Sequence, residues 1–265
     1  MPQSALPPEA PVLTQDGITF RDLNKNGRLD PYEDPLRPVA ERVFNLLVQM
    51  NLEEKVGLMF QDVIPLGLDG SLFDGPTWAG PFSTEHYLLD LRMNHFNVHQ
   101  IPEPRLAVAW SNRLQKLAER TRLGIPVTIS SDPRHAYTRS AGTSAVTDAF
   151  SRWPEPIGLA ATRDPALVRQ FGDIARQEYR AVGISTALHP MADLATEPRW
   201  MRCDGTFGED AELSAQMVEA YIRGFQGESI GPTSVSCMTK HFPGGGPQKD
   251  GLDPHFSYGK EQVYP

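Results

Sequence analysis

The sequence predicts an α/β fold of the (β/α)-barrel type, in which parallel strands alternate with helices. Short apolar runs of strand length alternate along the chain with longer segments of helical periodicity. Charged residues follow the ends of these runs instead of lying inside them. Strands separated by helices pair in parallel through right-handed crossovers, so their carboxyl ends gather at one rim. In such folds that rim carries the ligand site.

The amino-terminal part is expected to be an irregular arm followed by two helices. Residues 1–21 are rich in proline and polar side chains, which is typical of irregular structure. A helix over about 38–50 is indicated because its apolar side chains recur on one face. Asn51 and Glu54 then have the spacing of a capping box, with Asn51 as the N-cap of a second helix.

The remainder alternates between strands and helices. Asp164 and Pro165 mark one helix start, because Asp is a favourable N-cap and Pro fits the first helical position. The expected strands are 95–98, 126–130, 184–188 and 234–238, and the expected helices cover about 105–120, 165–181 and 210–226.

Composition excludes some classes of partner. A net charge of −8 argues against nucleic acid and against an anionic membrane surface, and no apolar run is long enough to span a bilayer. Residues 1–8 lack the basic and apolar regions of a signal peptide. The compartment stays open, with a periplasmic or secreted mature form favoured over a cytoplasmic protein. Cys203 and Cys237 form no metal pattern, and two free thiols are favoured over a single disulfide between them.

The polar residues of the predicted rim are both acidic and basic. A carboxylate accepts hydrogen bonds from two adjacent hydroxyls while Arg and Lys donate to neighbouring oxygens, so the set suits a polyhydroxylated ligand such as a sugar. The chain has no phosphate-binding P-loop, dinucleotide fingerprint, Gly-x-Ser-x-Gly elbow or His-Glu-x-x-His motif. The rim residues are Asp132 after strand 126–130, Asp193, Arg199 and Arg202 after strand 184–188, and Lys240 and His241 after strand 234–238.

Several stretches together resemble one enzyme family. They are MNLEEKVG at 50–57, RLGIP at 122–126, WPEPIGLAAT at 153–162, PRWMR at 198–202, FGED at 207–210, and KHFPG at 240–244. In this combination, from about residue 40 onward, the chain resembles the N-terminal barrel of glycoside hydrolase family 3, which contains β-glucosidases and β-xylosidases. Met201 stands where a glycine is usual.

The resemblance implies a sugar subsite, numbered −1, for the non-reducing glycosyl unit. Asp132, Arg202, Lys240 and His241 would hold its hydroxyls, whereas Asp193 and Arg199 would shape the loops. The substrate would be a β-linked gluco-oligosaccharide or an aryl glycoside, cleaved with retention by an Asp nucleophile and a Glu acid/base. No cofactor is needed for that catalysis.

Neither catalytic carboxylate is assigned within this chain. In the family the nucleophile follows the Lys-His motif on a later strand, and many members take the acid/base from a second α/β domain. The chain is therefore expected to hold an incomplete barrel and to need the rest of the enzyme as its partner. Alone, it is expected to be inactive and marginally folded. Asp250 and Asp253 are expected to shape the loop after the glycines.

Other functions remain open. A β-xylosidase of the same family cannot be separated from a β-glucosidase here. A β-N-acetylhexosaminidase is less favoured, because those members carry His after the Pro-Gly of the signature and an Asp-His pair in a later loop, whereas Gly245 and Gly246 follow here. A non-catalytic fragment that binds carbohydrate or calcium is the alternative outside enzymes.

Residues 22–33 match the loop template of the EF-hand calcium site. Gly27 supplies the sharp turn at the sixth position. The same residues also suit an Asx-rich turn that holds its own backbone without metal. The expected domains are an arm with this loop over 1–37 and the partial barrel over 38–265. The candidate calcium ligands are Asp22, Asn24, Asn26, the Arg28 carbonyl, Asp30 and Glu33.

Overall fold

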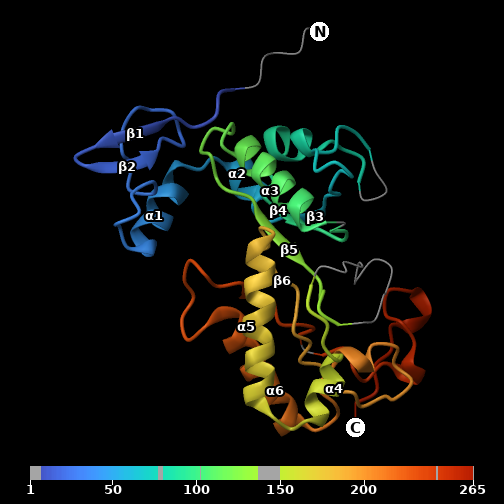
Figure 1. Cartoon of the computed structure of the whole chain (residues 1–265). Helices are drawn as coiled ribbons and strands as arrows, with labels where there is room; N and C mark the ends of the chain where they lie inside the picture. The colour runs from blue at the N-terminus through green and yellow to red at the C-terminus, as the bar shows by residue number, and fades with distance from the viewer. Residues whose placement is uncertain (1–6, 77–79, 102, 137–149, 243, 265) are drawn as a thin grey trace. The chain divides into compact units, whose positions relative to one another are not determined.

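The computed structural model describes residues 7–76, 80–101, 103–136, 150–242 and 244–264 (Figure 1). Two compact units make up the chain. The first comprises Met1–Val98 and Leu106–Thr128, and the second comprises His99–Arg105 and Ile129–Pro265. Across the described ranges, no helix combines the length and apolarity needed to cross a lipid bilayer.

The first unit opens with a β-hairpin formed by antiparallel strands β1 (Val12–Gln15) and β2 (Ile18–Arg21). Asp16 and Gly17 connect them with φ angles of 50° and 79°. Two successive positive φ angles are the requirement of a type I′ turn, and Asp-Gly satisfies it. The predicted irregular arm is therefore wrong over this stretch. The Asp-Gly signal outweighs the polar composition of the flanking residues.

Helices α1 (Val39–Gln49), α2 (Leu52–Gly57) and α3 (Pro104–Ala118) confirm the predicted helical segments. The capping box is also confirmed, because the Asn51 side chain accepts from the Glu54 N–H at 2.9 Å and the Glu54 carboxylate accepts from the Asn51 N–H at 3.0 Å.

Two parallel strands complete the first unit. The sequence did not predict the first of them, because Gln61 and Asp62 interrupt its apolar pattern. The strands are β3 (Gln61–Val63) and β4 (His95–Asn97), and a π-helical turn, η1 (His86–Asp90), precedes β4.

The second unit has parallel strands in chain order, confirming the predicted parallel α/β arrangement. Ser130 and Ser131 of β5 pair with β6, and β6 pairs with β7. The last two strands are shorter than predicted. The eight-stranded barrel implied by the resemblance stays a prediction. The elements of the second unit are β5 (Thr128–Ser131), α4 (Pro156–Ala161), α5 (Pro165–Ala181), β6 (Thr186–Ala187), α6 (Ala211–Gln226), β7 (Ser236–Cys237), and short 3-10 turns at Cys203–Gly205, Lys249–Gly251 and Ser257–Gly259.

Helices α5 and α6 pack side by side (Figure 1). Gly172 and Gly224 allow this approach, since a Cβ added to Gly172 would lie 3.0 Å from the Gly224 Cα. The predicted cap Asp164 is confirmed, because its carboxylate accepts from two backbone N–H groups of the first turn. Asp210 caps α6 in the same way by accepting from the Leu213 N–H at 2.7 Å. Both helices are thus fixed at their starts and held close along their lengths.

Candidate functional site

Asp132 and Lys240 meet although 108 positions separate them in the sequence. Asp132 follows β5 and Lys240 lies just beyond β7, so both stand at the carboxyl ends of parallel strands. The Lys240 ammonium donates to Asp132 Oδ1 at 3.1 Å. The Asp132 residue is 8% exposed, so this ion pair is sheltered from solvent screening. An ammonium beside a carboxylate offers both a hydrogen-bond donor and acceptors to a ligand.

Arg202 and His241 form a second contact in the same unit. Arg202 Nη1 lies 3.3 Å from His241 Nε2, and Arg202 Nη2 lies 3.7 Å from the Met191 sulfur. The predicted residues after β6 and after β7 are therefore adjacent in space. Because Lys240 and His241 are consecutive, this contact and the Asp132–Lys240 ion pair belong to one constellation.

Asp193 holds the His241 ring. Its carboxylate is fully buried and accepts from His241 Nδ1 at 2.9 Å and from the His241 backbone N–H at 3.2 Å. The Gly245 N–H donates to its other oxygen. Burial alone would raise the pKa of Asp193, but these hydrogen bonds from His241 and Gly245 lower it below its ordinary value. With Nδ1–H committed to Asp193, the neutral ring presents Nε2 as an acceptor.

A cavity of about 270 Å³ opens beside these residues. Its walls combine charged groups with apolar ones such as Met191 and Met201. Three of the four predicted sugar-binding residues, Asp132, Arg202 and Lys240, line this cavity. The fourth, His241, reaches the constellation through Arg202.

Asp253 and His255 also line the cavity, and sequence reasoning missed His255 entirely. Asp253 Oδ1 lies 2.7 Å from His255 Nδ1 and accepts from the His255 backbone N–H at 2.9 Å. These hydrogen bonds lower the pKa of Asp253. The contact to the His255 backbone is consistent with the expectation that Asp253 shapes its loop, and Asp253 lines the cavity as well. The sequence Asp253-Pro254-His255 after the glycines is the signal from which His255 could have been found.

Arg199 and Asp250 are not among the residues that line the cavity, and they pair with each other at 3.2 Å. Arg199 also binds Glu197 at 2.8 Å, and its side chain is 62% exposed. These contacts hold the loop, as expected for both residues. Cys203 and Cys237 are free thiols, which confirms that prediction.

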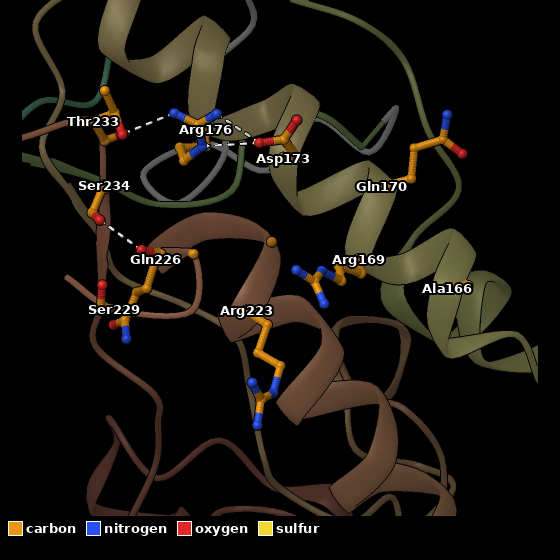
Figure 2. Close-up of a pocket in the computed structure, with 12 residues that line it drawn as sticks. Ala166, Arg169, Gln170, Asp173, Arg176, Arg223, Gln226, Ser229, Thr233 and Ser234 are labelled. Atoms are coloured by element: carbon orange, nitrogen blue, oxygen red, sulfur yellow. Dashed lines mark hydrogen bonds and ion pairs between the residues drawn. The ribbon is translucent and has the colours of Figure 1, made fainter. Parts of the chain in front are cut away.

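A larger cavity of about 510 Å³ lies along α5, α6 and the loop that follows α6 (Figure 2). Three arginines line it, and each already has a carboxylate partner. Arg169 and Arg223 both bind Glu228, at 2.7 and 2.5 Å, and Arg176 binds Asp173 at 2.6 Å. None of the predicted sugar-binding residues lines this cavity. It therefore offers neither the predicted chemistry nor an unpaired cation among the three arginines.

The loop at 22–33 is compact and holds much of its own backbone. The Asp22 carboxylate accepts from the Asn26 and Gly27 N–H groups at 3.0 and 2.8 Å. The side-chain amides of Asn24 and Asn26 both donate to Asp30 Oδ2 at 2.6 Å.

Glu33 closes the loop by accepting from the Leu23 N–H at 2.6 Å, and burial raises its pKa. In the part of the chain that the structure describes, no three carboxylate, imidazole or thiol groups converge as a metal cage. To ligate calcium, the amides of Asn24 and Asn26 would have to turn their oxygens inward.

Comparison with known proteins identifies the family. The model of the "Glycosyl hydrolase family 3 N terminal domain" matches residues 97–262. The chain belongs to glycosyl hydrolase family 3. That match spans Asp132, Arg202, Lys240 and His241, so the constellation lies inside the family domain.

Relatives in sequence and structure agree with this family. The chain is 47% identical to "Probable beta-glucosidase C" of Aspergillus oryzae, over 91% of this chain and 38% of that protein. It is also 47% identical to "Periplasmic beta-glucosidase/beta-xylosidase" of Dickeya chrysanthemi, over 95% of this chain and 38% of that protein. A family 3 β-N-acetylglucosaminidase from Paenibacillus shares the fold, with a TM-score of 0.61, 22% identity, and coverage of 78% of this chain and 35% of that one. The chain thus spans about 38% of the length of these curated relatives.

Proposed function

We propose that the enzyme to which this chain belongs is a retaining, exo-acting β-glycosidase, and most specifically a β-glucosidase. This chain would supply the −1 sugar subsite. The observation that carries the proposal is the sheltered Asp132–Lys240 ion pair on the wall of a cavity that Arg202 also lines. The Aspergillus relative, which is named as a β-glucosidase, supports the choice of glucoside, and the Dickeya relative, which is named as a β-glucosidase/β-xylosidase, keeps a β-xyloside as an alternative substrate.

The geometry suits recognition of neighbouring hydroxyl groups. Asp132 Oδ1 is engaged by Lys240, yet a carboxylate has further lone pairs that accept from sugar hydroxyls. Arg202 and Lys240 donate to sugar oxygens through charge-assisted bonds, which are stronger than neutral ones. A neutral His241 accepts at Nε2 from Arg202 Nη1, which helps to hold that guanidinium at the cavity. A glycosyl unit would thus meet both donors and acceptors.

The partner of this chain would be the rest of the enzyme, which completes the barrel and adds the two catalytic carboxylates. Helix α1 supports this proposal, because none of its residues is buried. Val43, Phe44 and Leu47 on it are 57, 67 and 48% exposed. An apolar stripe of this kind is typical of a helix that packs against another layer. We propose that later barrel elements cover it.

A β-N-acetylhexosaminidase is the second candidate, and one observation favours it. The Asp253–His255 pair lies on the wall of the same cavity as Lys240, and family members of that type carry such a pair in a later loop. His255 is 74% exposed on its side chain, so its free Nε2 is accessible to a bound glycoside.

We also propose that the loop at 22–33 takes up a structural calcium ion with no part in the chemistry. Asp22, Asn24, Asn26, Asp30 and Glu33 occupy the oxygen positions of the template. A periplasmic or secreted location is compatible with this. The name of the Dickeya relative, which includes "periplasmic", supports that location.

The test uses the protein expressed from the complete reading frame that contains this chain. The substrates are aryl β-D-glucoside, aryl β-D-xyloside and aryl N-acetyl-β-D-glucosaminide. We expect the highest kcat/KM on the glucoside and a β-configured first product by NMR. A preference for the N-acetylglucosaminide would favour the second candidate. Absence of hydrolysis on all three would overturn the glycosidase proposal.

A further inference from the structure

A series of hydrogen bonds links the side chains of Tyr221, His189 and Tyr179 next to the cavity. The Tyr221 hydroxyl lies 2.6 Å from His189 Nδ1, and the Tyr179 hydroxyl lies 3.1 Å from His189 Nε2. Tyr179 also lies 2.8 Å from the backbone oxygen of Asp132. His189 and Tyr221 line the cavity. The hydrogen-bond series therefore runs from Tyr221 on α6, through His189 after β6 and Tyr179 on α5, to the loop that holds the Asp132 carboxylate.

The donor and the acceptor of each hydrogen bond in this series follow from the number of protons that each group carries. A carbonyl oxygen only accepts, so the single hydroxyl proton of Tyr179 goes to Asp132. The Tyr179 oxygen must then accept from His189, which requires a proton on Nε2. A neutral His189 accordingly accepts on Nδ1 from the Tyr221 hydroxyl. Every donor points in one direction, from Tyr221 toward Asp132.

The three side chains are almost completely buried. Tyr179, His189 and Tyr221 are 0, 2 and 3% exposed. Burial lowers the pKa of His189 well below its ordinary value and raises the pKa of both tyrosines, so all three are neutral near pH 7. Because little solvent is present to replace a lost partner, breaking one of these hydrogen bonds would leave a buried polar group unsatisfied, which is costly. Tyr221 also stacks on Phe225 with ring centroids 4.9 Å apart.

We infer that Tyr179, His189 and Tyr221 are positioning residues that fix the backbone of Asp132 and thereby aim its carboxylate at the sugar. This inference rests on the proposed sugar-binding function. Tyr179 and Tyr221 are carried by α5 and α6, which the Gly172–Gly224 contact holds together. Rigid helices are a better support for a binding group than a loop alone. The packed helices and the ligand-binding loop are thus connected by hydrogen bonds.

The test removes hydroxyl groups singly in the protein from the complete reading frame. Tyr179→Phe deletes the contact to Asp132, and Tyr221→Phe deletes only the far end of the hydrogen-bond series. Tyr32→Phe is the matched control, because Tyr32 is also buried and donates to a backbone carbonyl, that of Leu123, at 3.2 Å. The dissociation constant for 1-deoxynojirimycin, a glucose-shaped inhibitor, is measured by calorimetry. Thermal melting confirms that each variant folds.

We expect Tyr179→Phe to weaken inhibitor binding about tenfold and Tyr221→Phe to weaken it about threefold, with Tyr32→Phe within about twofold of wild type. Adding Tyr179→Phe to Asp132→Asn should cost almost nothing further, since the hydroxyl acts through Asp132. Equal binding by Tyr179→Phe and Tyr32→Phe, or additive effects of Tyr179→Phe and Asp132→Asn, would overturn the inference. If the wild type bound no inhibitor but melted normally, the proposed function itself would fall.

Discussion

Asp193 binds His241 through both the ring and the backbone, with Oδ2 lying 2.9 Å from Nδ1 and 3.2 Å from the main-chain nitrogen. One buried carboxylate thus fixes both the position and the orientation of the imidazole. Its second oxygen holds Gly245, so the glycine-rich loop is anchored by the same residue. The role of the Lys-His motif therefore depends on a carboxylate 48 positions upstream.

Replacing that carboxylate should weaken the sugar site. We expect Asp193→Asn to lower kcat/KM on an aryl β-glucoside about tenfold or more, because a charge-assisted bond to His241 is lost. Asp210→Asn is the matched control, since Asn caps α6 as well as Asp does. Kinetics of Asp193→Asn within twofold of the control would contradict the positioning role.

The contact between Asp193 and His241 predicts that the stability of the fold depends on pH. Because hydrogen bonds lower the folded-state pKa of Asp193 below 3.8, the ionised form stabilises the fold above that pH. This contribution is lost as the pH falls through the lower folded value. The stability gap between wild type and Asp193→Asn should therefore be constant from pH 7 to pH 5 and shrink below about pH 4. Urea unfolding at several pH values measures it, and a gap that stays unchanged at pH 3 would count against the account.

The contact between α5 and α6 at Gly172 and Gly224 should not tolerate a larger residue at either position. A Cβ on Gly224 would lie 2.7 Å from the Gly172 Cα, so Gly224→Ala forces the helices apart. We expect a loss of about 1–3 kcal/mol in the free energy of unfolding. Gly231→Ala is the control, because a Cβ there meets no atom within 4 Å. Denaturant titration of both variants should separate them, and equal stabilities would disprove the tight contact.

Calcium should stabilise the loop at 22–33. We expect calcium to release heat on titration and to raise the melting temperature, and EDTA to reverse the rise. Asp22→Ala should abolish both effects, whereas Asp74→Ala, at an exposed site away from the template, should preserve them. A melting temperature that changes with neither calcium nor EDTA would favour the metal-free Asx turn.

Helices and the later strands could be predicted because their signals are local. Asp164 and Asn51 cap helices as their positions imply, and the apolar runs before Asp132 and Lys240 form parallel strands. The strand at Gln61–Val63 escaped prediction because its pairing with β4 comes from tertiary contacts and not from an apolar pattern. Hairpin β1–β2 was predictable from Asp16 and Gly17, because their turn signal outweighs the polar composition of the stretch.

The candidate site was predictable only in part. Asp132, Arg202 and Lys240 could be found because motif and strand end coincide, and they line one cavity. The Tyr179–His189 contact joins a helix to a strand end, and no sequence spacing reveals such a contact. The loop path that brings His255 to the cavity is likewise set by tertiary structure.

The central claim is that the constellation around Lys240 holds the sugar. Its most direct test compares Lys240→Met with Lys249→Met, a matched pair because Lys249 lies in the following loop and forms an exposed ion pair with Glu261 at 2.6 Å. Calorimetry measures the dissociation constant for 1-deoxynojirimycin in the protein from the complete reading frame. The account predicts that Lys240→Met weakens binding more than tenfold while Lys249→Met binds as wild type does. Equal affinities in the two variants would contradict it.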